Sequence, residues 1–300
     1  MNLTWLDDFL TLAELGNFSR AAEQRHMTQP AFSRRVRALE EWVGVALFDR
    51  SSHPVGLTEA GEWFRQVAQD TLARVARIPG EAQAIANAHS ATLRFAATHA
   101  LSLTFLPAWL RRVEATQPLG PVQLVSDVAT NCESMMLQGR VQFLLCHVHA
   151  QAPGRLADGE FRSVCVGTDT LLPVSAPATR GKPRHRLGSA ERVPLLSYSA
   201  ESGLGRVVRA LRADSLERAG VETVFTAHLA TLLKSMALEG RGVAFLPRTL
   251  IGDELADGRL VAAAGRDWAI DVEVRLFRRT EIQAPSVESF WRTASAIRLA

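Results

Sequence analysis

Residues 18–43 constrain the fold of this 300-residue chain more than any other stretch, because their pattern predicts two short helices with a tight turn between them. The first helix is expected to start at Ser19 and to carry small alanines that let a second helix approach closely. Thr28 suits the N-cap of the second helix because its hydroxyl can accept a free backbone N–H. Pro30 is tolerated in the first turn, where no intrahelical donor is needed. The second helix therefore has a well-marked start.

The second helix of this pair is amphipathic. Its apolar stripe contains Phe32, Val36, Leu39 and Val43. Its opposite and flanking faces carry Gln29, Ser33, Arg34 and Arg37. A helix with Gln, Ser and Arg near its N-terminus can enter the DNA major groove, where Gln pairs with adenine and Arg with guanine or phosphate. An ordinary solvated helix pair is the alternative that this helix alone leaves open.

Positive charge around the helix pair is local. Residues 1–90 contain nine Arg, no Lys and eleven Asp or Glu, a balance of −2, whereas the whole chain carries +3. Six of those nine arginines lie between Arg20 and Arg50. We therefore expect a focused phosphate contact from a few arginines, doubled by dimerisation, rather than a diffusely basic module.

Composition indicates a globular chain with more than one domain. A length of 300 residues with 47% hydrophobic content suffices for two or three modest cores. No run approaches the roughly 18 apolar residues of a membrane span, and Asp7 and Asp8 are atypical of a secretion signal, so we expect a cytoplasmic protein with no membrane partner. The three cysteines are odd in number and lack Cys-x-x-Cys spacing, which favours reduced thiols.

A third helix should complete the N-terminal core. A helical apolar stripe begins at Leu3, leaves Asp7 and Asp8 outside it, and ends at Gly16, a plausible C-cap. The three helices together would then enclose a small hydrophobic core.

A wing is expected after the helix pair. Gly44 should stop the second helix, and residues 45–58 can form two short strands around a polar tip. Arg50 and His53 would then be placed to meet backbone phosphate. Residues 1–57 therefore predict a winged helix-turn-helix.

Residues 58–90 predict a long linker helix. Thr58 and the acidic residues after it mark a start that complements the helix dipole. Its apolar residues recur at three, four or nearby offsets and are Phe64, Val67, Ala68, Leu72, Val75, Ile78, Ala82 and Ile85. This seam suits a partner helix, with burial in its own domain as the alternative. Pro79-Gly80 should kink or break the helix.

From residue 91 onward, strands alternate with helices. This pattern implies a mainly parallel sheet whose ligands bind at strand C-termini beside helix N-termini. One alternation covers about 91–162 and is completed by 268–300, and a second covers about 163–267. The fold class is therefore α/β with an all-α N-terminal part, and residues 91–300 should form a two-lobed clamshell.

Polar side chains are expected to converge on a ligand inside this clamshell, beginning with a predicted polar turn at 98–102. The candidate effector contacts are Thr98, His99, Ser102, His147, Tyr198, Ser199, Ser202 and His228. Each of them can also be a satisfied surface or core group.

Two other chemistries are weaker. Residues 146–149, Cys-His-Val-His, could suggest zinc or copper, but strand alternation separates the thiol from the imidazoles, so no metal and no cofactor are predicted. Hydrolase chemistry lacks a G-x-S-x-G elbow, and the Gly-rich stretch 203–205 lacks a Walker lysine. We expect no catalytic residues and no enzymatic activity.

With these features in place, the chain resembles the LysR-type transcriptional regulators over nearly its full length. The matching segments are Phe-Ser-Arg-Ala-Ala at 18–22, Thr-Gln-Pro-Ala-Phe-Ser-Arg-Arg-Val-Arg-Ala-Leu-Glu at 28–40, Leu-Phe-Asp-Arg at 47–50, Leu-Thr-Glu-Ala-Gly at 57–61 and Gly-Arg-Gly-Val-Ala-Phe-Leu-Pro at 240–247. The resemblance implies a winged helix-turn-helix, a linker-helix dimer that often assembles into tetramers, and a periplasmic-binding-protein-like effector domain.

The function expected from this resemblance is coupling of a small-molecule or stress signal to binding of a double-stranded DNA operator. The candidate DNA contacts are Ser19, Thr28, Gln29, Pro30, Ser33, Arg34, Arg37 and Arg50. RNA polymerase is the further partner that such a regulator can contact. The alternative is a ligand-binding clamshell protein whose N-terminal helices serve assembly rather than DNA reading.

Within the family, segments 97–103, 194–199 and 232–240 look most like the branch that responds to hypochlorite. That branch is linked to sensing by methionine oxidation. Leu204 stands where the resemblance would place a sensing methionine, and Met135, Met136 and Met236 have the spacing of core residues. Redox sensing is therefore not predicted from these positions.

Overall fold

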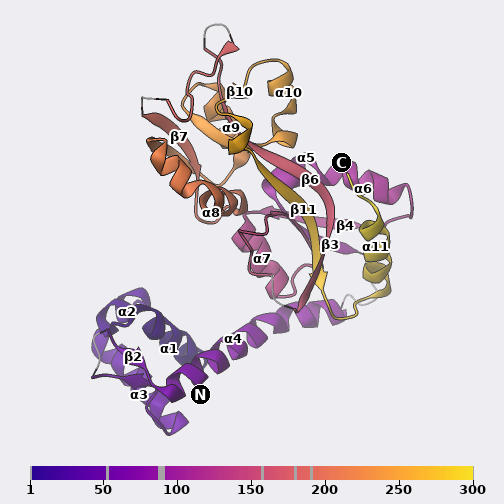
Figure 1. Ribbon diagram of the computed structural model, residues 1–300. Coiled ribbons are helices and arrows are strands. Elements are labelled where there is room, and N and C mark those ends of the chain that lie inside the picture. The colour runs from indigo at the N-terminus through magenta and orange to yellow at the C-terminus, as the bar shows by residue number, and fades with distance from the viewer. Residues whose placement is uncertain are drawn as a thin grey trace. The chain divides into compact units, whose positions relative to one another are not determined.

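The computed structural model describes residues 2–51, 54–86, 92–156, 159–178, 181–189 and 192–299. The chain divides into two compact units, Met1–Pro79 and Gly80–Ala300, which are considered separately (Figure 1). In the described ranges, no helix combines the length and the apolar character that a membrane crossing requires.

The N-terminal unit is a three-helix core with a small wing. Its elements are α1 (Leu3–Leu15), α2 (Phe18–Gln24), α3 (Gln29–Val43), β1 (Phe48–Asp49), β2 (Gly56–Leu57) and the first part of α4 (Glu59–Ala86). The ring of Phe9 lies at the centre, with ring centroids 5.1 Å from Phe48 and 5.0 Å from Phe64. Aromatic rings from α1, the wing and α4 thus fasten the wing and the linker helix to the helical core.

The helix boundaries follow local capping chemistry. Gly16 and Gly44 end α1 and α3 in the left-handed region, with φ of 59° and 88°, as expected. α2 begins at Phe18 rather than Ser19, because the Asn17 side chain accepts from two backbone N–H groups of its first turn. Thr28 occupies the N-cap position of α3, but its hydroxyl makes no capping hydrogen bond there, contrary to expectation.

The linker helix α4 does not break at its proline. It runs from Glu59 to Ala86 with Pro79 inside it, so the predicted break is wrong, whereas a kink at this position stays a prediction. A proline removes a single backbone donor, and the helical bonds on either side of it can carry the chain past that position. The apolar stripe of α4 is divided: Phe64 and Ala68 are buried in the N-terminal core, whereas Ile78 and Ile85 are exposed.

The C-terminal unit has two lobes. The first contains β3 (Leu93–Thr98), α5 (His99–Thr104), α6 (Leu106–Glu114), β4 (Val122–Asp127), α7 (Ala129–Leu137), β5 (Phe143–Val148) and α11 (Pro285–Ala296). The second contains β7 (Val193–Tyr198), α8 (Gly203–Arg218), β8 (Val221–Ala227), α9 (Ala230–Leu238), β9 (Val243–Pro247), η2 (Arg248–Leu250), α10 (Gly252–Ala256), β10 (Val261–Ala262) and η3 (Arg266–Trp268).

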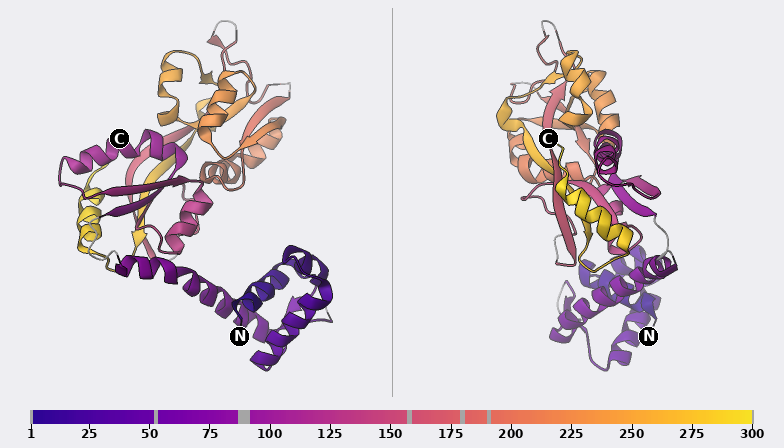
Figure 2. Two further views of the ribbon diagram at one scale, coloured as in Figure 1. Left: turned by 180° about the vertical axis from the view of Figure 1, so that it is seen from behind. Right: turned by 90° about the vertical axis from the view of Figure 1, so that its right-hand side faces the viewer.

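Two long strands, β6 (Phe161–Ser175) and β11 (Ile270–Arg279), run side by side between the lobes (Figure 2). The strand order is β4-β3-β5-β11-β6-β9-β7-β8, with β10 paired to β6. Strands are parallel within each lobe, but β6 and β11 pair antiparallel with each other and with their neighbours. The sheet is therefore more mixed than predicted, because both connecting strands run against the lobe strands.

Each lobe has its own hydrophobic core. In the first lobe, Phe95 packs on Phe143 and Phe290 with ring centroids 5.0 Å and 5.2 Å away. In the second lobe, Leu233 and Phe245 belong to a separate buried cluster. Separate cores let each lobe keep its shape if the connecting strands flex.

Gly80 lies where α4 packs closely against the turn after α7. A Cβ on Gly80 would lie 2.3 Å from the carbonyl oxygen of Gln138, so the backbones of α4 and of the turn after α7 are in direct contact. Alanine normally stabilises a helix interior by about 1 kcal/mol relative to glycine. We expect Gly80→Ala to lower the free energy of unfolding by about 1–2 kcal/mol instead, because overpacking displaces backbone. Urea denaturation would measure the change.

The matched control is Gly252→Ala at the start of α10. A Cβ there has no neighbour within 4 Å among the described residues, so stability should be unchanged or slightly higher. A Gly80→Ala variant as stable as the parent chain would contradict the close approach.

Candidate functional site

The exposed face of α3 is the first candidate site. Gln29, Arg34 and Arg37 are exposed and Ser33 is half-buried, whereas Phe32, Val36 and Leu39 are buried beneath them. Thr28 and Pro30 at the start of α3, and Ser19 in the first turn of α2, are also exposed. The fold therefore presents seven of the eight predicted DNA contacts on two helices joined by one tight turn, in the arrangement of a helix-turn-helix.

The eighth predicted contact, Arg50, has protein partners. Its Nη2 lies 2.6 Å from Oε2 of Glu40, and its guanidinium lies 5.7 Å from the centroid of the Phe18 ring. The other oxygen of Glu40 accepts from the backbone N–H groups of Leu47 and Phe48. Arg50 thus connects α3 to the wing, and its predicted contact with backbone phosphate stays a prediction. His53 lies outside the described residues.

A buried ion cluster sets the position of α3 in the N-terminal unit. Asp8 was expected to lie outside the core, but it is 1% exposed and contacts two arginines. Its Oδ1 accepts from Nε of Arg25 at 2.9 Å, and its Oδ2 lies 2.6 Å from Nη2 of Arg35. One carboxylate on α1 thereby holds the end of α2 and the middle of α3. The amphipathic pattern missed this role because burial of a charge depends on distant partners.

The second candidate site is a cavity of about 910 Å³ between the two lobes. Its walls come from the C-terminal ends of first-lobe strands, from the first turn of α8 and from the crossing strands β6 and β11. Five of the eight predicted effector residues line it: Thr98, His99, His147, Ser202 and His228.

The other three predicted residues do not line the cavity. Tyr198 is a buried core residue whose hydroxyl donates to the carbonyl oxygen of Phe245 at 2.9 Å. Ser199 follows it at the end of β7, also away from the cavity. Ser102 lies in the first helical turn of α5, not in a loop, and its hydroxyl donates to the carbonyl oxygen of His99. Because residues 99–104 form a helix, the Ser102 hydroxyl bonds to the backbone of the same helix instead of facing the cavity.

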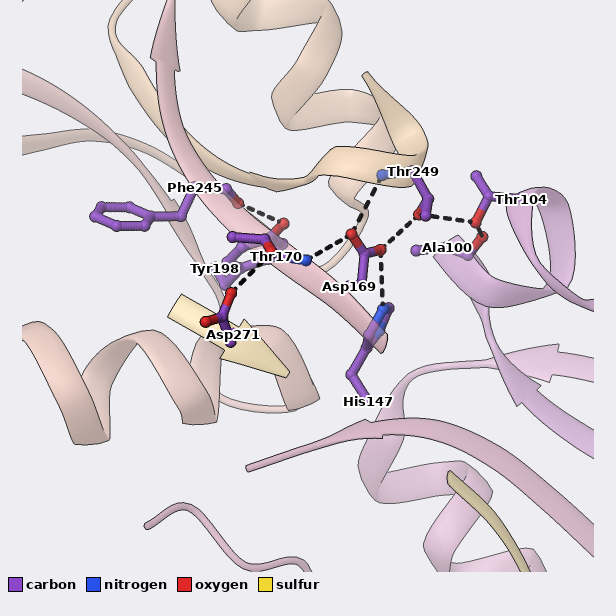
Figure 3. Close-up of polar contacts among 9 residues, drawn as sticks. All are labelled: Ala100, Thr104, His147, Asp169, Thr170, Tyr198, Phe245, Thr249 and Asp271. Atoms are coloured by element: carbon purple, nitrogen blue, oxygen red, sulfur yellow. Dashed lines mark hydrogen bonds and ion pairs between the residues drawn. The ribbon is translucent and has the colours of Figure 1, made fainter. Parts of the chain in front are cut away.

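A polar network joins the lobes at the hinge (Figure 3). Asp169 on β6 accepts from the Thr249 hydroxyl at 2.5 Å and from the backbone N–H of Thr170 at 2.7 Å. The Nε2 atom of His147, at the end of β5, lies 3.5 Å from the same carboxylate. Burial alone would raise the pKa of Asp169, but contacts with His147, Thr249 and Thr170 hold this pKa below its usual value. Asp169 and Thr249 carried no motif that sequence reasoning could detect.

A second bridge joins the two lobes beside the cavity. Glu133 in α7 accepts from Nη1 of Arg206 in α8 at 2.8 Å, and the Glu133 side chain is 6% exposed. A Cβ on Gly203 would lie 2.9 Å from the Ala129 side chain, so the two helix N-termini nearly touch. The lobes are therefore held together by an ion pair as well as by the hinge.

Two histidines face each other in the cavity. The rings of His99 and His228 lie 6.0 Å apart, and Nδ1 of His99 lies 2.9 Å from the Ser126 hydroxyl. Burial lowers the pKa of His99, with a further lowering by His228 and an opposing effect from Asp127. The lowered pKa favours the neutral imidazole of His99. Among the described residues, no three His, Cys, Asp or Glu side chains cluster as a metal site would need.

A helix-turn-helix with an exposed arginine face, carried on one chain with a ligand-sized cavity between two α/β lobes, defines a signal-responsive DNA-binding regulator. Residues 3–62 match the bacterial regulatory helix-turn-helix protein, lysR family, and residues 86–296 match the LysR substrate binding domain. The chain belongs to the LysR family of transcriptional regulators.

Similar proteins support this assignment over the full length. The Escherichia coli K12 HTH-type transcriptional regulator YjiE is 32% identical over 289 residues, which cover 96% of this chain and 92% of YjiE. The full-length structure of HypT from Salmonella typhimurium, a hypochlorite-specific LysR-type regulator, has a TM-score of 0.60 at 30% identity and covers 99% and 97% of the two chains. Vibrio fischeri DarR in complex with DNA has a TM-score of 0.59 at 29% identity, covering 99% of each chain.

The Asp8 ion cluster yields a stability prediction. We expect Asp8→Ala to lower the stability of the N-terminal unit by about 3 kcal/mol, because two arginines lose their shared, buried partner. Native-state hydrogen exchange of α1, α2 and α3 would measure this loss directly.

Asp7→Ala is the matched control for the Asp8 variant. Asp7 has a side chain 45% exposed and lies 3.7 Å from Arg25, so its removal should change stability by less than about 0.5 kcal/mol. Equal effects of the two substitutions would show that the cluster does not organise the unit.

Proposed function

We propose that a small molecule bound in the interlobe cavity controls which DNA sites the regulator can engage. The observation that carries this proposal is the cavity of about 910 Å³, a volume in the range that holds drug-sized ligands. Ligand contacts on both lobes would favour one closure of the clamshell. That closure would bias the relative placement of protomers and hence of their paired helix-turn-helix units.

We propose that operator sequence is read by α3. Gln29, Ser33 and Arg34 would contact base edges, and Arg37 would contact base or phosphate. Thr28, Pro30 and Ser19 would set the approach of the helix N-termini to the backbone. The complex of DarR with DNA supports this reading for a protein of similar fold. Arg50 would contribute by holding the wing against α3 through Glu40.

Assembly into a homodimer or homotetramer would supply the affinity that one unit lacks. Residues 1–90 have a balance of −2, so a single copy offers few cations to DNA. The exposed apolar residues of α4, Trp63, Ile78 and Ile85, provide a surface that a second linker helix would cover. A regulator that binds DNA would act in the cytoplasm, where RNA polymerase would be a further partner.

The alternative, in which the N-terminal helices serve assembly only, has less support. Residues 3–62 match a DNA-binding family model, and α3 leaves two arginines exposed at its surface. The hypochlorite response belongs to HypT and is not carried over, because Leu204 at the candidate sensing position is an aliphatic residue that oxidants do not modify.

Substitution of Arg34 tests sequence reading. Selection from a randomised DNA pool would first define the preferred site. We expect Arg34→Ala to weaken binding to that site by about 1–3 kcal/mol and to relax preference at one position of each half-site. Competition binding against scrambled DNA at fixed salt would measure both effects.

Arg65→Ala is the control, because Arg65 is an exposed arginine of α4 already paired with Glu62. The Arg65→Ala variant should prefer the same DNA sequence as the parent protein. Unchanged preference in the Arg34 variant would refute groove reading by this residue.

Substitution of Glu133 tests lobe closure. We expect Glu133→Gln to weaken the bridge to Arg206 and to raise hydrogen exchange in the first turns of α7 and α8, because a neutral amide binds guanidinium less strongly than a carboxylate. Glu254→Gln is the control, since it breaks a pair with Lys234 inside the second lobe. If hydrogen exchange in the Glu133→Gln variant rises only near residue 133, as in the control it rises only near residue 254, then Glu133 does not hold the lobes together.

A further inference from the structure

The cavity between the lobes has an excess of negative charge. Five carboxylates line it, together with two arginines and four histidines. The carboxylates belong to Asp127, Glu133, Asp169, Asp271 and Glu273. The cations are Arg206 and Arg275, and each is already paired, Arg206 with Glu133 and Arg275 with Glu273. The two arginines therefore offset two of the five carboxylates.

The remaining three carboxylates have only neutral or imidazole partners in the described part of the chain. Asp127 accepts from the backbone N–H of Val128 and from the Asn131 amide. Asp271 accepts from the hydroxyl of Thr170. Asp169 is held by the hinge network described above. Hydrogen bonds of this kind orient a carboxylate but leave its negative charge in place.

One buried carboxylate oxygen in the cavity has no hydrogen-bond partner in the part of the chain that the structure describes. The Oε2 atom of Glu133 is buried and has no hydrogen-bond partner among the described residues, although Oε1 is paired with Arg206. Glu133 is 4% exposed and lines the cavity. A buried carboxylate oxygen without a donor is unfavourable, and a ligand N–H group that reached it would remove that cost.

The hydroxyl groups of Ser102 and Ser126 are satisfied internally, whereas the buried Oγ1 of Thr98 has no hydrogen-bond partner among the described residues. Ser102 donates to the carbonyl oxygen of His99, and its Oγ lies 2.8 Å from that of Ser126. Ser126 is in turn 2.9 Å from Nδ1 of His99. Of these hydroxyls, that of Thr98 is therefore left to contact a ligand, either as a donor or as an acceptor.

Part of the cavity wall is apolar. Leu156, Phe161 and Phe277 line the portion that extends into the first lobe. A bare metal ion would not fill a cavity of about 910 Å³, and no cluster of three metal-ligating side chains occurs among the described residues. An organic ligand with an apolar body fits this wall better than an inorganic cation.

We propose that the interlobe cavity takes a small organic cation, a protonated amine or guanidine with an apolar body. The inference rests on the proposed function of the cavity as the effector site and adds the charge class of the effector. A cleft lined by one sign of charge concentrates counter-charged ligands and disfavours ligands of like charge. The cationic head would lie among Asp127, Asp271 and Glu133, and the apolar body would lie toward Phe161 and Phe277.

The test uses the full-length chain and three probes that share one apolar body: 2-phenylethylamine, 2-phenylethanol and phenylacetate. Agmatine and 1,4-diaminobutane extend the amine series. Thermal shift and titration calorimetry at pH 7 would measure binding. We expect at least one amine to raise the melting temperature, and 2-phenylethylamine to bind at least about 10-fold more tightly than the alcohol and the carboxylate.

Variants locate the site. We expect Asp127→Asn and Asp271→Asn each to weaken amine binding by about 10-fold while the melting temperature without ligand stays close to that of the parent chain. The two positions lie on different strands, so loss of folding in one variant leaves the other as a test. Asp253→Asn is the matched control, because Asp253 is an exposed aspartate of α10 that does not line the cavity.

Three outcomes would overturn the proposal: phenylacetate binding more tightly than the amine, amine binding unaffected by both variants, or no amine binding at millimolar concentration. Tight phenylacetate binding that is lost in a Thr98→Val variant would uphold the cavity as an effector site and reject only its charge class. Failure of the regulator function itself would appear separately, as absence of any preferred DNA sequence in the selection experiment.

Discussion

The antiparallel pairing of β6 with β11 is the interaction on which the C-terminal unit depends. The two strands pair from Phe161 with Arg279 to Leu171 with Ile270, and a register shift falls between Val274 and Arg275. β11 also pairs with β5 of the first lobe, and β6 also pairs with β9 of the second. Each lobe sheet is thus extended by one strand of the same ladder. The ladder places the cavity, because Asp169, Asp271 and the arginine beside the shift all project from it.

A buried carboxylate fixes the positions of neighbouring elements in each of the two units. Asp8 joins three helices through two arginines, and Asp169 joins the lobes through a hydroxyl and an imidazole. A charge removed from water is tolerated only where donors replace its hydration, so each carboxylate requires its partners to be present together. This requirement fixes helix and lobe positions more narrowly than apolar packing, which is non-directional. The position of α3, which we propose reads DNA, therefore depends on an acidic residue that faces away from its exposed surface.

A shared fold does not determine which ligand a cavity binds. Relatives at about 30% identity share its architecture over nearly the whole length, including one that is specific for hypochlorite. The side chains that line the cavity are free to differ within that architecture, because the lobe cores and the β6–β11 ladder keep its shape. An acidic cavity with Leu204 in its wall is the version found here.

The amino-acid pattern alone determined the helix-turn-helix, the linker helix and the alternation of strands and helices, because these depend on periodicity and capping between near neighbours. It also named five residues that line the cavity, through their position at strand ends. Only the tertiary structure decided that Asp8 is buried, that Arg50 is paired, that α4 continues through Pro79 and that Tyr198 belongs to the core. Those outcomes depend on partners far away in the sequence. The charge of the cavity also depends on residues far apart in the sequence. It comes from carboxylates on α7, β4, β6 and β11, which no local sequence pattern connects.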